Sequence, residues 1–186
     1  MELSWREALQ KLKDGNVKYI NARYNGGDVS PEKRRETYEN GQKPYAVVVA
    51  CSDSRVIPES IFFAGIGELF TVRVAGNVID SSVLASVEYA VAHLKAPLVA
   101  VMGHTSCGAV NAVIGGGDCG RVKMITDKIR LVLGEERDAR KACILNAKAG
   151  AREVERALGG EYPAVKVVCA VYNTDSGKAD FFEEFN

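Results

Sequence analysis

The sequence predicts a single α/β domain with a mainly parallel central sheet of four to five strands, flanked by helices, and an N-terminal helical arm. Short runs of branched apolar residues, typical of strands buried on both faces, alternate along the chain with longer segments of helical periodicity. Strands separated by helices favour parallel pairing. At 186 residues the chain is long enough to bury one core without disulfide cross-links. We therefore expect residues 1–186 to form one domain.

The N-terminal arm, residues 1–43, carries two helix starts. Ser4 and Glu7 fit a capping box, in which the serine hydroxyl accepts a hydrogen bond from the amide three residues on and the glutamate reaches back. Ser30 followed by Pro31 places a cap residue before a proline at the first helical position. Apolar residues are sparse in this arm, so we expect it to pack on a partner subunit.

The rest of the chain alternates between strand and helix patterns. Apolar runs predict strands at residues 45–50, 69–74, 98–102 and 165–171, and a short final edge at 178–185. Helical spacing predicts a short helix from Pro58, a longer one capped by Asp80 or Ser81, and two more at residues 121–133 and 135–158. The small-residue run after Cys107 is assigned to no element, and the glycines at 115–117 indicate a flexible loop.

The charge balance, the apolar runs and the N-terminal residues argue against a nucleic-acid-binding, membrane-spanning or secreted protein. The 24 basic residues equal the 24 acidic ones, so no basic excess indicates a nucleic-acid partner. No apolar run reaches the roughly 18 residues that a membrane span needs, and the N-terminus carries charges where a signal peptide needs an apolar core. We expect a cytoplasmic protein. Its five cysteines, an odd number, favour metal ligands or free thiols over a disulfide framework.

Two loops that follow predicted strands carry the residues best suited to chemistry. Cys51-Ser52-Asp53-Ser54-Arg55 follows the first strand, and His104-Thr105-Ser106-Cys107-Gly108 follows the third. Parallel neighbours would open both loops at one edge of the sheet, where open α/β sheets place their ligands. Cys51, His104 and Cys107 could then converge on a single metal ion. Two thiolates and an imidazole suit Zn²⁺, and three protein ligands leave a position for water.

Other interpretations of these residues stay open. An unpaired cysteine at a strand end, such as Cys51, is commonly a small buried hydrophobe. A cysteine-dependent phosphatase loop has about five residues between its cysteine and arginine, whereas three residues separate Cys51 from Arg55. We expect Cys119, Cys143 and Cys169 to be ordinary thiols. We expect His93 to be a surface or packing residue.

Asp53 and Arg55 alternate with Cys51, so all three side chains could point the same way from an extended segment. A bidentate guanidinium would offset repulsion between the carboxylate and two thiolates; the alternative is a salt bridge that only ties the loop down. Zinc with two thiolates and a neutral imidazole sums to zero charge, so its water should ionise in the mildly alkaline range rather than near pH ~7. Asp53 could also occupy the fourth coordination position of the zinc ion, from which hydroxide would displace it as the pH rises.

These motifs resemble those of the β-class carbonic anhydrases. The resemblance rests on both loops in this order, with further matches at residues 41–44, 72–77, 88–91 and 168–172. It implies that Cys51, His104 and Cys107 hold zinc, and that Asp53, paired with Arg55, either orients a zinc-bound hydroxide or takes its place. The residues that the resemblance places in the substrate pocket are Gln42, Phe70, Tyr89 and Gly108, with Gln42 as a hydrogen-bond donor to bicarbonate.

The function that the resemblance implies is zinc-dependent, reversible hydration of carbon dioxide to bicarbonate and a proton, by a homodimer or a multiple of dimers such as a homotetramer. One alternative is hydrolysis of carbon disulfide or carbonyl sulfide at the same site, and another is a zinc-binding or thiol-responsive protein without turnover. Val74 departs from the family pattern, which usually has asparagine there. Only two histidines are present, so a histidine proton shuttle is poorly provided for.

Overall fold

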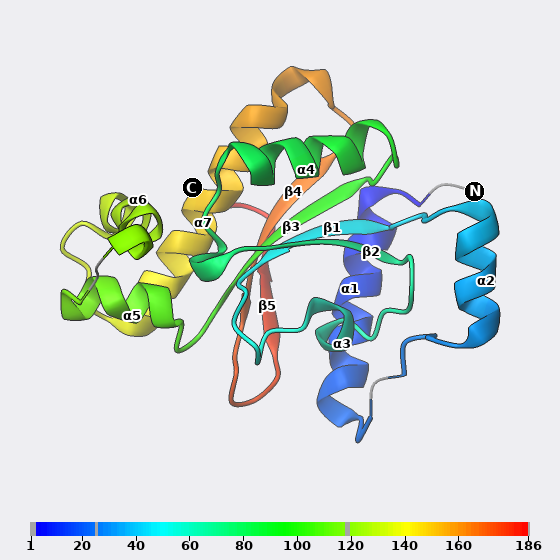
Figure 1. The fold of residues 1–186 in the computed structure, drawn as a ribbon, viewed down its shortest axis with the longest axis horizontal. Helices are drawn as coiled ribbons and strands as arrows, with labels where there is room; N and C mark the ends of the chain where they lie inside the picture. Colours follow the sequence, from blue (N-terminus) through cyan, green and yellow to red (C-terminus); the bar gives the residue numbers. More distant parts are fainter. Residues whose placement is uncertain (1–2, 25, 118–119, 186) are drawn as a thin grey trace.

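A five-stranded sheet in the order β2-β1-β3-β4-β5 forms the centre of the molecule (Figure 1). The computed structural model describes residues 3–24, 26–117 and 120–185. Four strands run parallel and β5 lies antiparallel to β4, which confirms the predicted fold class. The strands are β1 (Ala46–Ala50), β2 (Leu69–Arg73), β3 (Leu98–His104), β4 (Lys166–Tyr172) and β5 (Ala179–Phe182).

Helices cover both faces of this sheet. In Figure 1, α1 and α3 lie on one side, α4 and α7 lie on the other, and α5 and α6 pack together beyond the end of the sheet. The helices are α1 (Trp5–Asn21), α2 (Pro31–Asn40), α3 (Pro58–Ile61), α4 (Ser81–Ala92), α5 (Gly108–Gly115), α6 (Lys123–Leu133) and α7 (Ala139–Leu158). Short 3₁₀ turns occur at Ala75–Asn77, Gly120–Val122 and Gly159–Glu161. None of the helices in the described ranges is long and apolar enough to cross a membrane.

The central strands are buried on both faces, as their unbroken apolar runs predict. In β1, Val48 and Ala50 face the core layer under α1, whereas Val47 and Val49 face the layer under α4 and α7. All four of these side chains are fully buried. Successive side chains of a strand point to opposite faces of the sheet. A strand therefore needs a continuous apolar run to place apolar side chains in both core layers.

The N-terminal arm divides into two parts with different surroundings. The capping box is present at the start of α1, where Ser4 Oγ accepts from the Glu7 amide and the Glu7 carboxylate accepts from the Ser4 amide at 2.7 Å. Leu9 and Leu12 of α1 are buried against the sheet of their own chain. In α2 no residue is buried, and Tyr38 is 89% exposed. Packing of the arm on a partner therefore stays a prediction for α2, because α1 already covers its own core.

Strand register brings the two motif loops to one edge of the sheet. β1 and β3 are hydrogen-bonded parallel neighbours with Ala50 opposite Met102. The strands therefore end side by side, and the residues that follow them emerge together. The segment after Cys107, assigned to no element from the sequence, forms α5. Its start has no side-chain cap, so the usual local signal for a helix start is missing there.

Candidate metal centre

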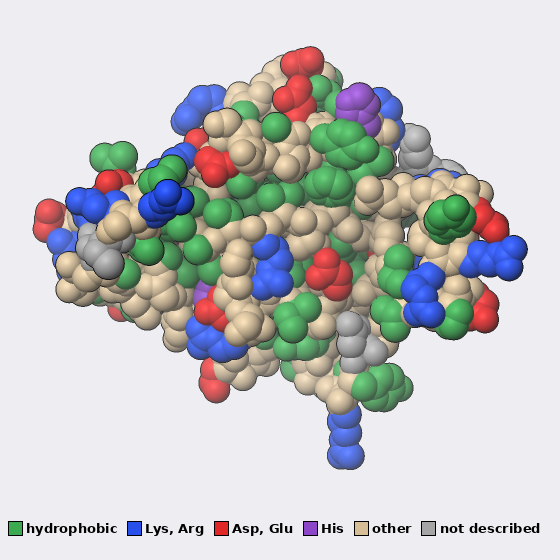
Figure 2. Space-filling view, viewed as in Figure 1, with side chains coloured by type: hydrophobic (Ala, Val, Ile, Leu, Met, Phe, Trp, Pro, Cys, Tyr) green, Lys and Arg blue, Asp and Glu red, His purple; other side chains and the backbone are tan. Residues whose placement is uncertain are grey.

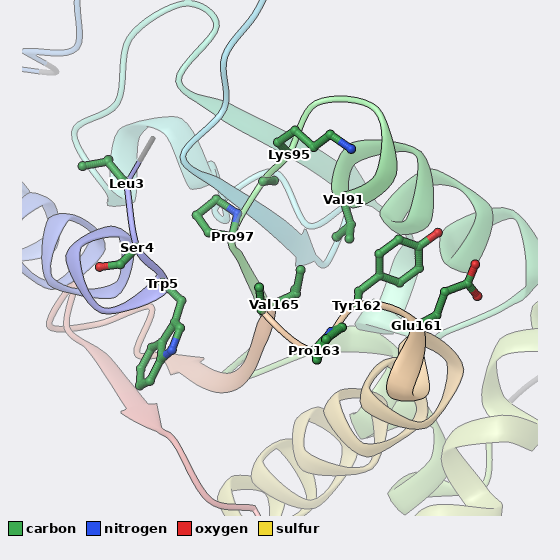
Figure 3. Close-up of a pocket in the computed structure, with 12 residues that line it drawn as sticks. Leu3, Ser4, Trp5, Val91, Lys95, Pro97, Glu161, Tyr162, Pro163 and Val165 are labelled. Carbon is green, nitrogen blue, oxygen red and sulfur yellow. The ribbon is translucent and has the colours of Figure 1, made fainter. Parts of the chain in front are cut away.

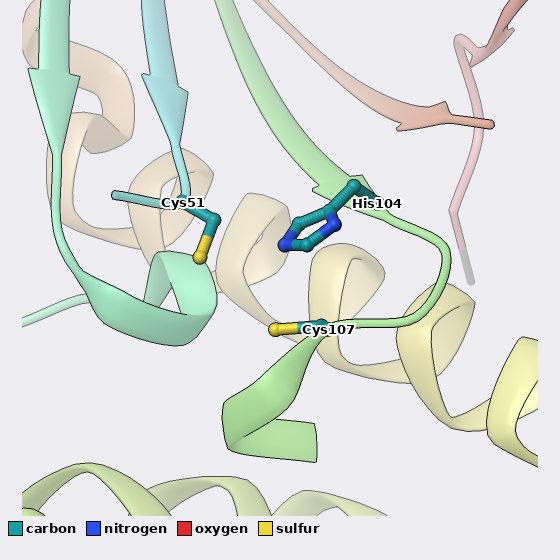
Figure 4. A group of neighbouring side chains, drawn as sticks. All are labelled: Cys51, His104 and Cys107. Atoms are coloured by element: carbon teal, nitrogen blue, oxygen red, sulfur yellow. The ribbon is translucent and has the colours of Figure 1, made fainter. Parts of the chain in front are cut away.

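Three side chains meet at the carboxyl edge of the sheet (Figure 4). Cys51 directly follows β1, His104 is the last residue of β3, and Cys107 directly precedes α5. Each offers one ligand atom, and these atoms lie within 4.8 Å of one another. The three residues are at most 4% exposed. The site predicted from two separate loops is therefore assembled, and Figure 4 shows both sulfur atoms and the imidazole pointing into the same space.

The orientation of the His104 imidazole is one that would suit a metal ligand. Its Nδ1 lies 2.9 Å from the carbonyl oxygen of Thr105. A carbonyl can only accept, so Nδ1 carries the proton and the lone pair is left on Nε2. Nε2 is buried and has no hydrogen-bond partner among the described residues. A buried lone pair without a partner is unfavourable, and a metal ion between the two thiols would satisfy it.

The two thiols influence each other's pKa, because their sulfur atoms lie close together in a buried site. A hydrogen bond from Cys107 stabilises the Cys51 thiolate and lowers the pKa of Cys51 well below its ordinary value. The same hydrogen bond, together with burial, raises the pKa of Cys107, because a second negative charge would lie beside the first. A bound divalent cation would instead lower the pKa of Cys107, because it favours two thiolates. The donor set therefore fits a soft to borderline cation such as Zn²⁺.

Backbone amides support the Cys51 sulfur from two directions. The Gly76 amide donates to Cys51 Sγ at 3.2 Å, and the Asp53 amide donates at 3.4 Å. The Gly76 peptide is in turn fixed by Asn146 of α7, whose Nδ2 donates to the Gly76 oxygen at 2.8 Å. Arg73 holds the same loop by donating to the carbonyl oxygens of Cys51 and Asp53. Gly76, Arg73 and Asn146 were not among the residues selected from the sequence, because each acts from a distant element.

The Asp53 carboxylate is paired with Arg55 as the sequence predicts. Nε and Nη2 of Arg55 donate to the two carboxylate oxygens at 2.9 and 2.7 Å. This pairing holds the pKa of Asp53 well below its usual range. The chain turns at residues 54–55 instead of staying extended, and the Arg55 amide also donates to Asp53 Oδ1. The group of three converging ligand atoms does not include the Asp53 carboxylate.

Known proteins that resemble this chain share both its sequence and its fold. A family model described as carbonic anhydrase matches residues 46–158, which include all three converging side chains. Carbonic anhydrase 2 of Mycobacterium tuberculosis H37Rv is 38% identical over 191 residues, covering 92% of this chain and 90% of the relative. The chain belongs to the β-carbonic anhydrase family. The structure of the β-carbonic anhydrase CafA of Aspergillus fumigatus matches with a TM-score of 0.73 and 26% identity over 95% of this chain and 89% of that one.

A second structural match concerns the fold alone. The chain is 22% identical to a tetrameric β-carbonic anhydrase of Sordaria macrospora, with a TM-score of 0.68 over 81% of this chain and 91% of that one. The β-carbonic anhydrase fold thus extends over most of the described residues. The Val74 side chain packs partly buried against the cluster that contains Cys51 and Cys107.

The four residues expected in the β-carbonic anhydrase substrate pocket do not lie together in one chain. Gly108 directly follows Cys107 at the metal centre. Gln42 precedes β1, whereas Cys51 follows it, so the length of the strand separates them. Phe70 pairs with Val47 in the first half of β1. Tyr89 of α4 contacts Phe70, with ring centroids 6.1 Å apart. Three of the four residues are therefore at the opposite end of β1 and β2 from Cys51.

Among the described residues, Cys143, Cys169 and His93 lie outside the group of converging ligands. Cys143 and Cys169 are buried free thiols, and burial raises the pKa of Cys169 to about 12. Cys119 lies outside the described residues. His93 is exposed and stacks on Tyr89 with centroids 5.1 Å apart, as expected for a surface or packing residue.

A separate hollow of about 490 Å³ lies at the other edge of the sheet (Figure 3). It is lined by Pro97 and Val165, which immediately precede β3 and β4, and by Trp5 and Tyr162. The three metal-ligand candidates follow the carboxyl ends of strands, so this hollow is not part of the metal centre.

Proposed function

We propose that this member of the β-carbonic anhydrase family catalyses the reversible hydration of carbon dioxide to bicarbonate and a proton. The observation that carries the proposal is the convergence of Cys51, His104 and Cys107, with the His104 Nε2 lone pair left free for a metal ion. In this proposal the three side chains hold Zn²⁺. When bound there, Zn²⁺ supplies Lewis acidity that lets water ionise at much lower pH than in bulk.

In the proposed reaction Asp53 orients the attacking water. Its carboxylate is 18% exposed and stays ionised beside Arg55, so it can accept a hydrogen bond from a water molecule at the metal centre. Arg55 also donates to the carbonyl oxygen of Ser106 at 3.1 Å. Through these contacts Arg55 fixes the carboxylate relative to the turn that joins His104 to Cys107. In this proposal the released proton passes to solvent or buffer, because within one chain His93 packs on Tyr89 rather than at the group formed by Cys51, His104 and Cys107.

The substrate pocket, in this proposal, is completed by a partner subunit. β2 is an edge strand, and its register places Leu69 and Arg73 at opposite ends of β1. Two β2 strands paired antiparallel across a two-fold axis would bring the Gln42 end of one chain beside the Cys51 end of the other. Gln42, Phe70 and Tyr89 would then face the partner's metal centre. This geometry accounts for their separation from the metal centre within one chain.

Exposed apolar side chains support self-association. Tyr89 is 48% exposed and Ile57 is 45% exposed. Figure 2 shows hydrophobic side chains gathered over the face that carries α4 and β2. Apolar patches of this kind commonly mark protein interfaces. We propose a dimer or a multiple of dimers, and a relative from Sordaria macrospora with the same fold is tetrameric. We further propose that the protein acts in the cytoplasm.

Stopped-flow measurement of carbon dioxide hydration, on protein of measured zinc content, tests the proposed function. We expect activity that scales with zinc and rises toward mildly alkaline pH. Cys51→Ser should lose both zinc and activity, whereas Cys169→Ala, which changes a buried cysteine of β4, should keep both. A zinc-loaded protein that is inactive from neutral to alkaline pH would contradict the proposal. Activity on carbon disulfide or carbonyl sulfide instead would assign the site to those substrates.

A further inference from the structure

We infer that Thr174 is a positioning residue for the metal centre, and that it acts by holding the Thr105 carbonyl that orients His104. The inference rests on the proposed role of His104 as a metal ligand. Thr174 lies in the turn between β4 and β5, far along the chain from His104.

Hydrogen bonds connect Thr174 to His104 through one intermediate residue. The Thr174 amide donates to Thr105 Oγ1 at 3.0 Å, and the two hydroxyl oxygens lie 3.0 Å apart. Thr174 Oγ1 also donates to the Thr105 carbonyl oxygen at 3.5 Å. This is the same carbonyl oxygen that accepts from His104 Nδ1 at 2.9 Å. One arrangement satisfies every contact: the Thr105 hydroxyl donates to Thr174 Oγ1, and the Thr174 hydroxyl donates to the carbonyl.

The sheet itself does not fix the orientation of this carbonyl. The β3–β4 ladder ends at His104 opposite Tyr172, and the Thr105 amide makes one more bond to the Tyr172 oxygen at 2.9 Å. Beyond that point the chain turns sharply, because Ser106 has a positive φ of 58°. Within the described ranges no backbone amide donates to the Thr105 oxygen. The carbonyl therefore depends on Thr174 for support, in addition to its bond with the imidazole.

The turn that carries Thr174 is stable without the threonine hydroxyl. Asn173 Oδ1 accepts from the amides of Asp175 and Ser176, at 2.9 and 3.2 Å. The Gly177 amide donates to the Asn173 oxygen, and the Asn173 amide donates to the Lys178 oxygen. These contacts form an Asx-type turn that is closed by its own atoms. Removing the hydroxyl of Thr174 should therefore leave the turn folded and act mainly on Thr105.

Hydrogen bonds to the ring nitrogen that does not bind the metal set the orientation of a histidine ligand, and their loss weakens metal binding by roughly 10–100-fold. Thr174 acts one residue further away, so we expect an effect at the lower end of that range. Thr174→Val removes the hydroxyl and keeps the shape of the side chain, whereas Thr174→Ser keeps the hydroxyl. Thr37→Val is the matched control, because among the described residues Thr37 Oγ1 donates only to α2 carbonyls on the arm.

The first measurement is the rate at which the zinc-loaded protein loses zinc to an excess of chelator. We expect Thr174→Val to lose zinc roughly tenfold faster than wild type, and Thr174→Ser and Thr37→Val to stay within about twofold of wild type. The second measurement is the ¹⁵N NMR spectrum of the histidine rings, which is simple because the chain has two histidines. The Nδ1–H signal of His104 should shift or broaden in Thr174→Val and be restored in Thr174→Ser.

The outcomes separate this inference from the proposed function. If wild type holds zinc and Thr174→Val matches it in both measurements, Thr174 has no positioning role. If Thr174→Ser behaves like Thr174→Val, the methyl group and its packing matter rather than the hydroxyl, and the inference is wrong. A zinc-loaded wild type without carbon dioxide hydration would contradict the proposed function, while the zinc-loss and NMR results would still support the role of Thr174.

Discussion

The Arg55 guanidinium donates hydrogen bonds to both carboxylate oxygens of Asp53. The same guanidinium also donates to the carbonyl oxygen of Ser106. One arginine thus joins the loop after β1 to the turn between His104 and Cys107. Arg55 thereby holds the ionised Asp53 carboxylate in a fixed direction, and in the proposed reaction this direction has a kinetic consequence.

Asp53→Asn should keep zinc and lose turnover. The amide keeps the size of the carboxylate but removes the charge that Arg55 binds and one of the two acceptor oxygens. We expect kcat/KM for carbon dioxide hydration to fall by at least about 100-fold, the scale of a lost acid–base or orienting group. Asp127→Asn, which breaks a surface pair with Arg130 on α6, is the control. Wild-type turnover in Asp53→Asn at full zinc content would reduce Asp53 to a structural role.

Gly76→Ala should disturb both the fold and the metal centre. Gly76 has a positive φ of 67°, and an added Cβ would lie 2.9 Å from Ile129 Cδ1 and 3.0 Å from Ala109 Cβ. The strain and overpacking should cost about 1–3 kcal/mol of unfolding free energy. The shift of the Gly76 amide away from Cys51 Sγ should also speed zinc loss.

Gly116→Ala separates backbone strain from crowding. Gly116 has a similar φ of 71°, but no atom of the described residues lies within 4 Å of its added Cβ. We expect the unfolding free energy of this variant to fall by about 1 kcal/mol, because alanine is strained in the left-handed backbone conformation. We expect it to retain zinc like wild type. Urea unfolding and chelator competition measure the two effects. Equal behaviour of the two variants would show that the contact of Gly76 with Cys51 is unimportant for the metal.

Mixed dimers can test whether Gln42 serves the partner's metal centre. Gln42→Ala and Cys51→Ser should each be weakly active or inactive alone. When the two chains are mixed, one site in each heterodimer combines intact ligands from one chain with Gln42 from the other. Random pairing should restore about a quarter of wild-type activity, since about half of the dimers are mixed and each has one intact site of two.

The control for this mixing experiment is the double variant Gln42→Ala/Cys51→Ser mixed with Gln42→Ala. No intact site can form in that mixture, so activity should not rise. Equal recovery in both mixtures, or no recovery in either, would argue against a pocket shared between subunits.

Glu68 should contribute to stability in a pH-dependent way. Burial by itself would raise the pKa of Glu68, but hydrogen bonds from the Gly65 amide and from Lys11 outweigh it, and the pKa is lowered. A lowered pKa in the folded state means that the contribution is complete above the unfolded value of about 4.3 and is lost as the pH falls through the folded pKa. The Lys11–Glu68 pair is partly exposed, so solvent screening limits its contribution to about 1 kcal/mol or less.

Urea unfolding of wild type and Glu68→Gln, compared at each pH, measures this contribution. The difference in unfolding free energy should be constant from pH ~7 to ~5.5 and shrink as the pH approaches 4 and falls below it. Zinc release at low pH affects both proteins and cancels in the difference. A difference that grows on acidification would contradict the assigned direction of the pKa shift.

Short-range patterns in the sequence predicted most of the elements and the candidate ligands, although α5 was not predicted because its start has no side-chain cap. Apolar runs placed the strands, and caps such as Ser4 and Asp80 placed helix starts, because both patterns act within about four residues. Both cap side chains accept the expected backbone amides in the structure. Cys51, His104 and Cys107 could be selected because each follows a predicted strand, and parallel strands end at a common edge.

Only the tertiary structure decided how the ligands are held. The Gly76 amide reaches Cys51 Sγ from the turn after β2, and Asn146 reaches Gly76 from α7. Thr174 supports the carbonyl that orients His104 from the β4–β5 turn. These contacts depend on strand order and register, which bring together residues far apart in the chain. No local pattern encodes a hydrogen bond across such a separation, because its geometry exists only after the strands have paired and the helices have packed.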